Sequence, residues 1–258
     1  MRTVTLTKET TKDILENLLK RSPNQYGSYE TAVREILAKI QEEGDGALFA
    51  YTKKFDRAEI TEQNVRVTDE EIREAYETVD PALVDVIRKS RVNIRNYHEK
   101  QKQNSWFTSS EDGTMLGQKV TPLEKVGVYV PGGKAVYPSS VLMNIVPAKV
   151  AGVDRIIMTT PPGPDGKVNP STLVAANEAG ADEIYKAGGA QAIGALAYGT
   201  QSIPKVDKIV GPGNIFVALA KKAVYGHVSI DSIAGPSEIL VLADDSANPR
   251  FVAADLLF

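Results

Sequence analysis

Glycine-containing junctions that carry one polar side chain are the features of this 258-residue sequence best suited to binding a ligand. Gln191, Asn214 and Ser237 each stand in such a junction. Glycine lets the backbone approach a ligand closely, and neutral amide and hydroxyl groups suit a ribose, an amide or a substrate amine. These side chains therefore predict a crevice for a dinucleotide or another polar metabolite. The four junctions are PGGKAVYPSS (131–140), AGGAQA (187–192), GPGN (211–214) and AGPSE (234–238).

Each junction also has a plainer interpretation. Glycine-rich turns often serve only to start a helix, so Gln191 and Asn214 are explained about equally well as helix caps and as ligand contacts. A turn or a cap would equally account for the Ser237 hydroxyl. No G-x-G-x-x-G follows a predicted strand, so the usual dinucleotide fingerprint is absent from the sequence. The segment PPGPDG (161–166) is typical of an exposed surface loop.

The composition of the chain excludes several kinds of catalytic site, metal site and binding partner. The chain has no cysteine, which excludes disulfides, thiolate zinc ligands and a thiol nucleophile. Its two histidines, His98 and His227, are predicted to be surface or helix-end residues and are too few for a histidine-rich metal site. The formal net charge of -3 provides no basic excess for nucleic acid or a membrane. The first twenty residues suit neither a secretory signal nor a spanning helix, so we expect a cytoplasmic protein whose partners are small molecules and copies of itself.

The part of the chain before the junctions predicts helices followed by a short strand, up to about residue 125. Thr7 is positioned to cap the first helix. Thr68 with Glu71 is the pattern of a capping box, and Asp80 before Pro81 is the pattern of a further helix start. These signals predict a scaffold and carry no chemistry of their own.

From residue 126 onward, short strands rich in Val and Ile alternate with helical patterns of about ten residues. This succession of βαβ units predicts an α/β fold with a mostly parallel, Rossmann-like sheet covered by helices. Ligands of such sheets collect at the carboxyl ends of the strands, where the junctions lie. The predicted strands are 126–130, 154–160 and segments near Ile184, Ile209, Val228 and Ile239, and the predicted helices are 141–151 and those beginning at Asn169–Pro170, near Gln191 and after Asn214.

Four long blocks of the sequence resemble the signature blocks of histidinol dehydrogenase, in the same order and at similar spacing. Two earlier segments, GDGALFAYTKKFD (44–56) and the surroundings of Trp106, are similar too, so the resemblance covers essentially the whole chain. The four blocks are VGVYVPGGKAVYPSSVLMNIVPAKVAGV, AGGAQAIGALAYGT, KIVGPGNIFVALAKK and IDSIAGPSEILVLAD.

The resemblance implies an oxidoreductase of histidine biosynthesis. The family oxidises L-histidinol through L-histidinal to L-histidine with two NAD molecules, holds one zinc ion per active site and forms an intertwined homodimer. Carried over by motif, Tyr129, Gln191 and Asn214 fall on NAD-contacting positions and Ser237 on a substrate-contacting one. Without the resemblance, Tyr129 would be explained equally well as an aromatic residue packed in the core at a strand end.

The family architecture, which is aldehyde-dehydrogenase-like, also implies a division of the chain. A Rossmann-like NAD-binding domain at 126–236 is expected to be inserted in a second α/β domain. The first part of that second domain would be 21–125, and 237–258 would be an incomplete continuation of it. Residues 1–20 are expected to form a helical arm.

The sequence departs from the family pattern at its last residue. In the family, the helix corresponding to PRFVAADLL (249–257) continues with a serine and then Gln-Ala-Glu-His, whose glutamine and histidine bind zinc. Phe258 stands in place of that serine. The resemblance therefore places the zinc ligands and the Glu-His acid/base pair outside these 258 residues, so we expect no catalytic and no metal-binding residue among them and no activity from this chain alone.

Two alternatives remain open at this point. The chain can be a non-catalytic product of a truncated gene that binds NAD weakly or not at all. It can also be a fragment that complements a separately encoded C-terminal half. Sequencing the DNA beyond the codon for Phe258 would discriminate between them, because a Gln-Ala-Glu-His reading in any frame would indicate truncation of an ordinary enzyme.

Overall fold

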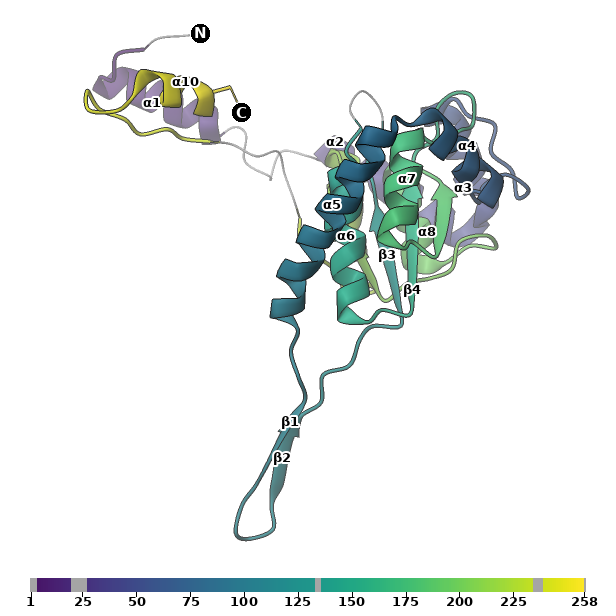
Figure 1. The fold of residues 1–258 in the computed structure, drawn as a ribbon. Coiled ribbons are helices and arrows are strands. Elements are labelled where there is room, and N and C mark those ends of the chain that lie inside the picture. Colours follow the sequence, from purple (N-terminus) through teal and green to yellow (C-terminus); the bar gives the residue numbers. More distant parts are fainter. Residues whose placement is uncertain (1–3, 20–26, 133–135, 234–238, 258) are drawn as a thin grey trace.

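The structure, a computed structural model, describes residues 4–19, 27–132, 136–233 and 239–257. Its centre is a parallel sheet with helices on both faces (Figure 1), which confirms the predicted α/β fold. The helices are α1 (Lys8–Leu19), α2 (Gly27–Glu43), α3 (Asp45–Asp56), α4 (Asp69–Thr78), α5 (Pro81–His98), the short 3-10 helix η2 (Glu99–Gln101), α6 (Pro138–Ala151), α7 (Pro170–Ala179), α8 (Gly189–Tyr198), α9 (Ile215–Val224) and α10 (Pro249–Asp255). The strands are β1 (Trp106–Ser109), β2 (Met115–Gln118), β3 (Lys125–Tyr129), β4 (Arg155–Thr160), β5 (Glu183–Lys186), β6 (Lys208–Val210) and β7 (Ser229–Ile230).

Side-chain caps start several helices where the sequence predicts them. The Thr68 hydroxyl accepts the N–H of Glu71, and the Glu71 carboxylate accepts the N–H of Thr68, so α4 begins with a complete capping box. Asp80 caps α5 by accepting the N–H of Ala82 at 2.9 Å. These bonds satisfy N–H groups that have no partner inside the helix.

The five-stranded sheet has the order β5-β4-β3-β6-β7, and all neighbouring strands are parallel. The chain forms β3 first, adds β4 and β5 on one side, and then returns to add β6 and β7 on the other side. The strand order therefore reverses between β3 and β6. In open α/β sheets, the loops that leave the two strands at such a reversal diverge and form the usual ligand crevice.

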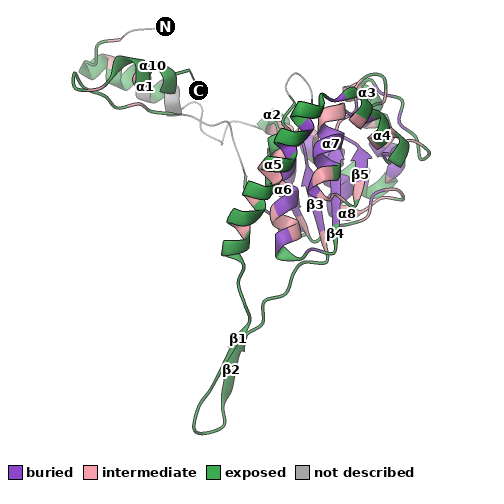
Figure 2. Ribbon diagram, viewed as in Figure 1, coloured by how far each residue is buried: buried purple, intermediate pink, exposed green. Residues whose placement is uncertain are grey.

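Two hydrophobic cores cover the two faces of this sheet. Ile157 and Ile209 belong to the core that α2, α3, α8 and α9 share, while Val128 and Met158 belong to the core that α4 to α7 share. Figure 2 shows the buried residues gathered in the sheet and on the inner sides of its helices. Helices α2 to α5 thus complete both cores of a sheet that follows them in sequence. The domain boundary expected at residue 126 remains a proposal.

Strands β1 and β2 form an antiparallel hairpin outside the main sheet. Every residue of both strands is exposed, and the hairpin extends away from the sheet and its helices (Figures 1 and 2). The sequence predicts one short strand in this region, and the structure has two.

The predicted strand near Ile239 is wrong. Residues 239–243 have no regular secondary structure, and Leu240 and Leu242 are 90% and 95% exposed. An apolar run becomes a strand only where another strand accepts and donates its backbone hydrogen bonds. No strand in the described ranges pairs with this segment.

Candidate functional site

The loop that follows β6 begins in close contact with the end of β3, at the reversal of strand order. Gly211, the first residue after β6, has a φ of +112°, and a Cβ atom at this position would overlap the carbonyl oxygen of Tyr129. Only glycine allows this approach without strain, because it has no Cβ and readily adopts positive φ. The start of the loop after β6 is therefore fixed beside the end of β3, at the edge where a ligand is expected.

An ion pair between buried Lys221 and the partly exposed side chain of Asp231 holds the loop after β6 in place. Lys221 of α9 is 2% exposed, and its Nζ donates to the Gly211 carbonyl at 2.9 Å and binds the carboxylate of Asp231. Asp231 also accepts the N–H of Gly211 at 2.8 Å. Both backbone groups of Gly211 are thus bonded to one ion pair, which specifies the path of this loop.

Tyr129, predicted to contact NAD, ends β3 and is buried. Its hydroxyl accepts the N–H of Gly189, the first residue of α8, at 3.1 Å. Burial, together with the nearby carboxylate of Asp56, raises the pKa of Tyr129 to about 12, so the phenol is neutral at physiological pH. In this structure Tyr129 positions the N-terminus of α8, and its contact with NAD stays a prediction.

Gln191 lies in the first turn of α8 and is 1% exposed. Its Oε1 has no hydrogen-bond partner in the described structure, and this side chain does not cap the helix. Of the two interpretations that the sequence leaves open for Gln191, the helix cap is therefore wrong. A buried amide oxygen without a partner is costly, and such groups call for an explanation such as a bound ligand or water.

Asn214 does cap a helix. It is exposed and stands at the N-cap of α9, where its Oδ1 accepts the N–H groups of Phe216 and Val217 at 3.0 and 3.2 Å. The side-chain Nδ2 remains a donor that could face a ligand, so the cap and the predicted contact are compatible. Ser237, predicted to contact the substrate, lies outside the described residues.

Unpartnered polar atoms gather on the face of the sheet that carries α3 and α8. Thr159 is the neighbour of Tyr129 on β4 in the strand register, and its side chain lies on the same face. Thr52 and Asp56 lie one turn apart on α3, which packs against α8. The buried side-chain atoms without a partner in the described ranges are Thr52 Oγ1, Asp56 Oδ2, Thr159 Oγ1 and Gln191 Oε1.

Asp56 is the ionisable member of this group, and the sequence analysis did not single it out. Burial of its carboxyl raises its pKa from 3.8 to about 6. Asp56 ends the block GDGALFAYTKKFD, which resembles the family, and it is an acidic residue in the last turn of a helix, where a carboxylate is unfavourable. That misplaced charge is the signal by which the sequence could have indicated it.

A cavity of about 590 Å³ lies over the carboxyl ends of β3 and β4. Its walls include Asp56, Gly132 after β3, and the loop that begins with Pro161 after β4. Gly132 and Gly188 both pack closely on Pro161, since a Cβ atom on either would come within 2.6 Å of that ring. The ends of β3, β4 and β5 are thus drawn together at one edge. The loop PPGPDG, expected to be a plain surface loop, forms part of this wall.

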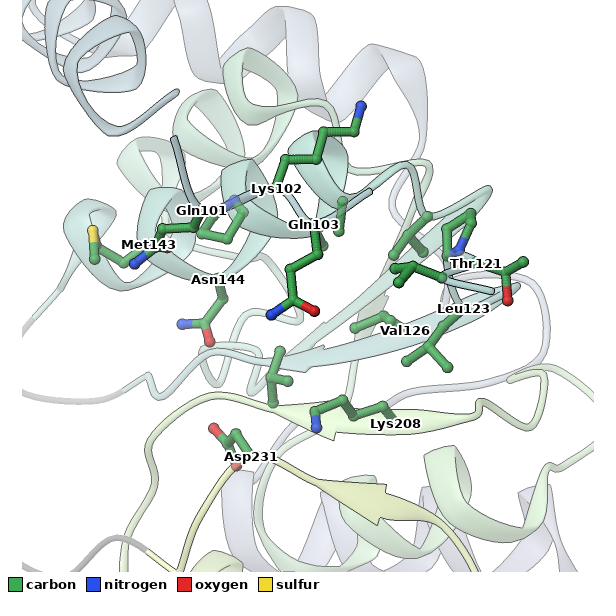
Figure 3. A pocket seen from close by; sticks show the side chains of 17 residues that line it. Gln101, Lys102, Gln103, Thr121, Leu123, Val126, Met143, Asn144, Lys208 and Asp231 are labelled. Carbon is green, nitrogen blue, oxygen red and sulfur yellow. The ribbon is translucent and has the colours of Figure 1, made fainter. Parts of the chain in front are cut away.

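A second cavity, of about 560 Å³, lies on the other face of the sheet (Figure 3). It is bordered by Asn144 of α6, Gln103 before β1, Lys208 of β6 and Asp231 after β7. Neither cavity is lined by Tyr129, Gln191 or Asn214, and the carboxylate in the second cavity, that of Asp231, is already bound by Lys221. The cavity above β3 and β4 has the unpartnered carboxyl of Asp56 in its wall and is therefore the better candidate for the ligand.

A metal site is not evident in the described part of the chain. There, no group of three or more His, Cys, Asp or Glu residues is placed to hold a metal ion. His98 is the last residue of α5 and His227 is exposed, which confirms the prediction for both. No helix in the described ranges is both long enough and apolar enough to cross a membrane.

Comparison with known proteins agrees with these features. The family profile described as Histidinol dehydrogenase matches residues 19–258. Histidinol dehydrogenase of Bacillus subtilis is 61% identical over 225 residues, which are 87% of this chain and 52% of that protein. The protein of the same name from Heliobacterium mobile is 57% identical over 242 residues, which are 94% of this chain and 57% of that protein.

A solved structure has the same fold. The crystal structure of histidinol dehydrogenase from Elizabethkingia anophelis matches with a TM-score of 0.82 at 45% identity, over 88% of this chain and 52% of that chain. The chain spans about half the length of the relatives that it matches. Because the family profile covers nearly all of the chain and the fold agrees with a solved member, the chain belongs to the histidinol dehydrogenase family of oxidoreductases.

Proposed function

We propose that this chain provides the NAD-binding part of an enzyme that oxidises L-histidinol through L-histidinal to L-histidine. The observation that carries the proposal is the reversal of strand order between β3 and β6. Tyr129 ends β3, Asn214 follows β6, and Gln191 lies on α8, whose first N–H is bonded to Tyr129. A dinucleotide bound along this edge of the sheet would lie close to all three side chains.

The unpartnered polar atoms fit such a ligand. The Oε1 atom of Gln191 is a hydrogen-bond acceptor, and the Oδ2 atom of Asp56 is one when the carboxyl is ionised. Both atoms are buried and neither has a donor. NAD offers donors of the matching kind, namely ribose hydroxyls and the carboxamide and adenine amino groups. When bound, NAD supplies the hydride acceptor, while the residues described here bind and orient it.

Titration of the 258-residue chain with NAD tests the proposal. Gln191→Ala and Asn214→Ser should each weaken binding about five-fold, since a lost ligand hydrogen bond costs about 1 kcal/mol. Serine retains an oxygen that can cap α9, so the second variant reports on the amide Nδ2. Asn248→Ser, at the N-cap of α10, is the matched control and should leave NAD affinity unchanged. Equal affinity in wild type and both site variants would contradict the assignment.

The zinc ion implied by the family does not fit the residues described. They include no cluster of metal-binding side chains, and we derive no step through the metal. We propose that the 258-residue chain by itself holds no stoichiometric zinc and does not oxidise histidinol. Metal analysis after dialysis and a histidinol-dependent NADH assay test this. One tightly held zinc per chain, or steady NADH formation free of host enzyme, would refute it.

The remaining expectations belong to the same proposal. They are the use of two NAD molecules per histidinol, a homodimer, a cytoplasmic location, and contact of Ser237 with the substrate. The molecular mass in solution tests the homodimer. The effect of Ser237→Ala on histidinol affinity tests the contact of Ser237 with the substrate.

A further inference from the structure

Asp56 lies in the wall of the candidate ligand cavity, but it is not among the residues proposed above to contact NAD. It is the last residue of α3, and it lines the cavity over β3 and β4 together with Gly132 and Pro161. Most of that lining comes from the loops after β3 and β4 and the start of α7, whereas Asp56 reaches it from a helix that precedes the whole sheet.

No interaction in the described structure compensates for the placement of this carboxylate. Its Oδ2 is buried and accepts no hydrogen bond. The C-terminal end of a helix carries partial negative charge, which repels a carboxylate. Arg57, directly after it, ends the helix in a left-handed conformation with a φ of +60°. Burial without a partner and the position at the helix end are both unfavourable for the Asp56 carboxylate, so a ligand is the better explanation of its placement.

The other charged groups of the cavity are already engaged. Asp165, the second carboxylate in the lining, accepts the N–H of Lys167 through Oδ1 at 3.1 Å. Lys167 itself lies 2.9 Å from the carboxylate of Glu74. In βαβ nucleotide folds, an acidic side chain near the end of the second strand accepts the ribose hydroxyls. Here β4 is that second strand, and Asp56 is the carboxylate beside its end with a free acceptor.

We propose that Asp56 accepts hydrogen bonds from the adenosine ribose hydroxyls of the dinucleotide and excludes a ribose that carries a 2′-phosphate. The inference rests on the proposed NAD site and names its specificity-determining residue. An ionised carboxylate has only acceptors, which suits a pair of neighbouring hydroxyls. The 2′-phosphate of NADP would place a second negative group beside it, with Lys167 already paired.

Titration of the full chain with NAD and NADP at pH 8 tests this, because Asp56 is ionised there. Asp56→Asn keeps the shape of the side chain and removes the charge. Loss of a charge-assisted bond should weaken NAD roughly ten-fold or more, while NADP binds as in wild type or better. Asp165→Asn is the matched control, since it removes the same charge from the same cavity. It should change the ratio of the two affinities by less than about two-fold.

An NAD analogue without the adenosine 2′-hydroxyl provides a second measurement on the unaltered protein. The analogue should bind wild type roughly ten-fold more weakly than NAD does. Its affinity should fall little further in Asp56→Asn, because the missing hydroxyl and the substitution remove the same interaction. This measurement decides the matter even if the variant does not fold.

The possible failures are distinguishable. If wild type binds no NAD at millimolar concentration, the proposed function fails. If wild type binds NAD but Asp56→Asn weakens NAD and NADP equally, Asp56 contacts a part that they share, and the ribose assignment is overturned. Unchanged affinities in the variant, or full affinity of the analogue for wild type, would overturn it as well.

Discussion

Replacing Asp56 by asparagine should stabilise the protein at neutral pH. The pKa of this carboxyl is raised by burial from 3.8 to about 6 in the folded chain. Between these two values the folded state binds more protons than the unfolded state, so folding stability falls as pH rises through this window. The loss is complete above pH 6 and corresponds to at most about 3 kcal/mol, at about 1.4 kcal/mol per pKa unit. Since the side chain is only partly buried, we expect about 1–3 kcal/mol.

Chemical denaturation at pH 8 and pH 4.5 measures this difference. The asparagine variant should exceed wild type by about 1–3 kcal/mol at pH 8, and most of the advantage should vanish at pH 4.5, where Asp56 is protonated. Asp165→Asn is the control and should not stabilise, because the Asp165 carboxylate accepts a backbone N–H. A variant that is no more stable than wild type at pH 8, or that has the same advantage at both pH values, would refute the reasoning.

Three further substitutions test the site. Gly211→Ala should lower the free energy of unfolding by about 2–4 kcal/mol, since its Cβ would overlap the Tyr129 carbonyl at a positive φ. Urea unfolding measures this, and a loss below about 0.5 kcal/mol would show that the loop after β6 can move away from the end of β3. Lys221→Met should lower the free energy of unfolding by about 1–3 kcal/mol, because it removes the bonds of the Lys221 Nζ to Asp231 and to the Gly211 carbonyl. Adding Asp231→Asn should restore part of the loss in the same assay, so simple additivity would contradict the ion pair. Gln191→Met should raise the melting temperature by about 2–4 °C while weakening NAD, because it removes a buried acceptor that has no protein partner; a lower melting temperature would indicate an unrecognised partner.

Much of the fold could be predicted because its signals are local. The capping box of Thr68 and Glu71 and the cap of Asp80 are satisfied by neighbours a few residues away, so the sequence alone specifies where those helices begin. The strand at Ile239 failed for the opposite reason. An apolar run does not reveal whether another strand lies beside it, and pairing partners are far apart in the chain.

The candidate site was predicted in part for the same physical reason. Gln191 and Asn214 stand at glycine turns that any parallel sheet would bring to its carboxyl edge, so their region was predictable. The sequence did not show that Asn214 caps its helix and Gln191 does not, because this difference depends on how the side chains pack. Asp56 escaped notice because it lies about seventy residues before β3, and only the packing of α3 on α8 brings it to the cavity.

The contribution of α2 to the core beneath α8 and α9 affects how the chain folds as it is made. Leu37 and Ile40 of α2 pack against Gly194 of α8, more than 150 residues later in sequence. At roughly 5–20 residues per second, the apolar stripe of α2 leaves the ribosome roughly 10–30 s before its partner exists. During that interval the stripe is open to chaperones or to other nascent chains. The core that α2 shares with α8 and α9 therefore cannot form until most of the sheet has been synthesised.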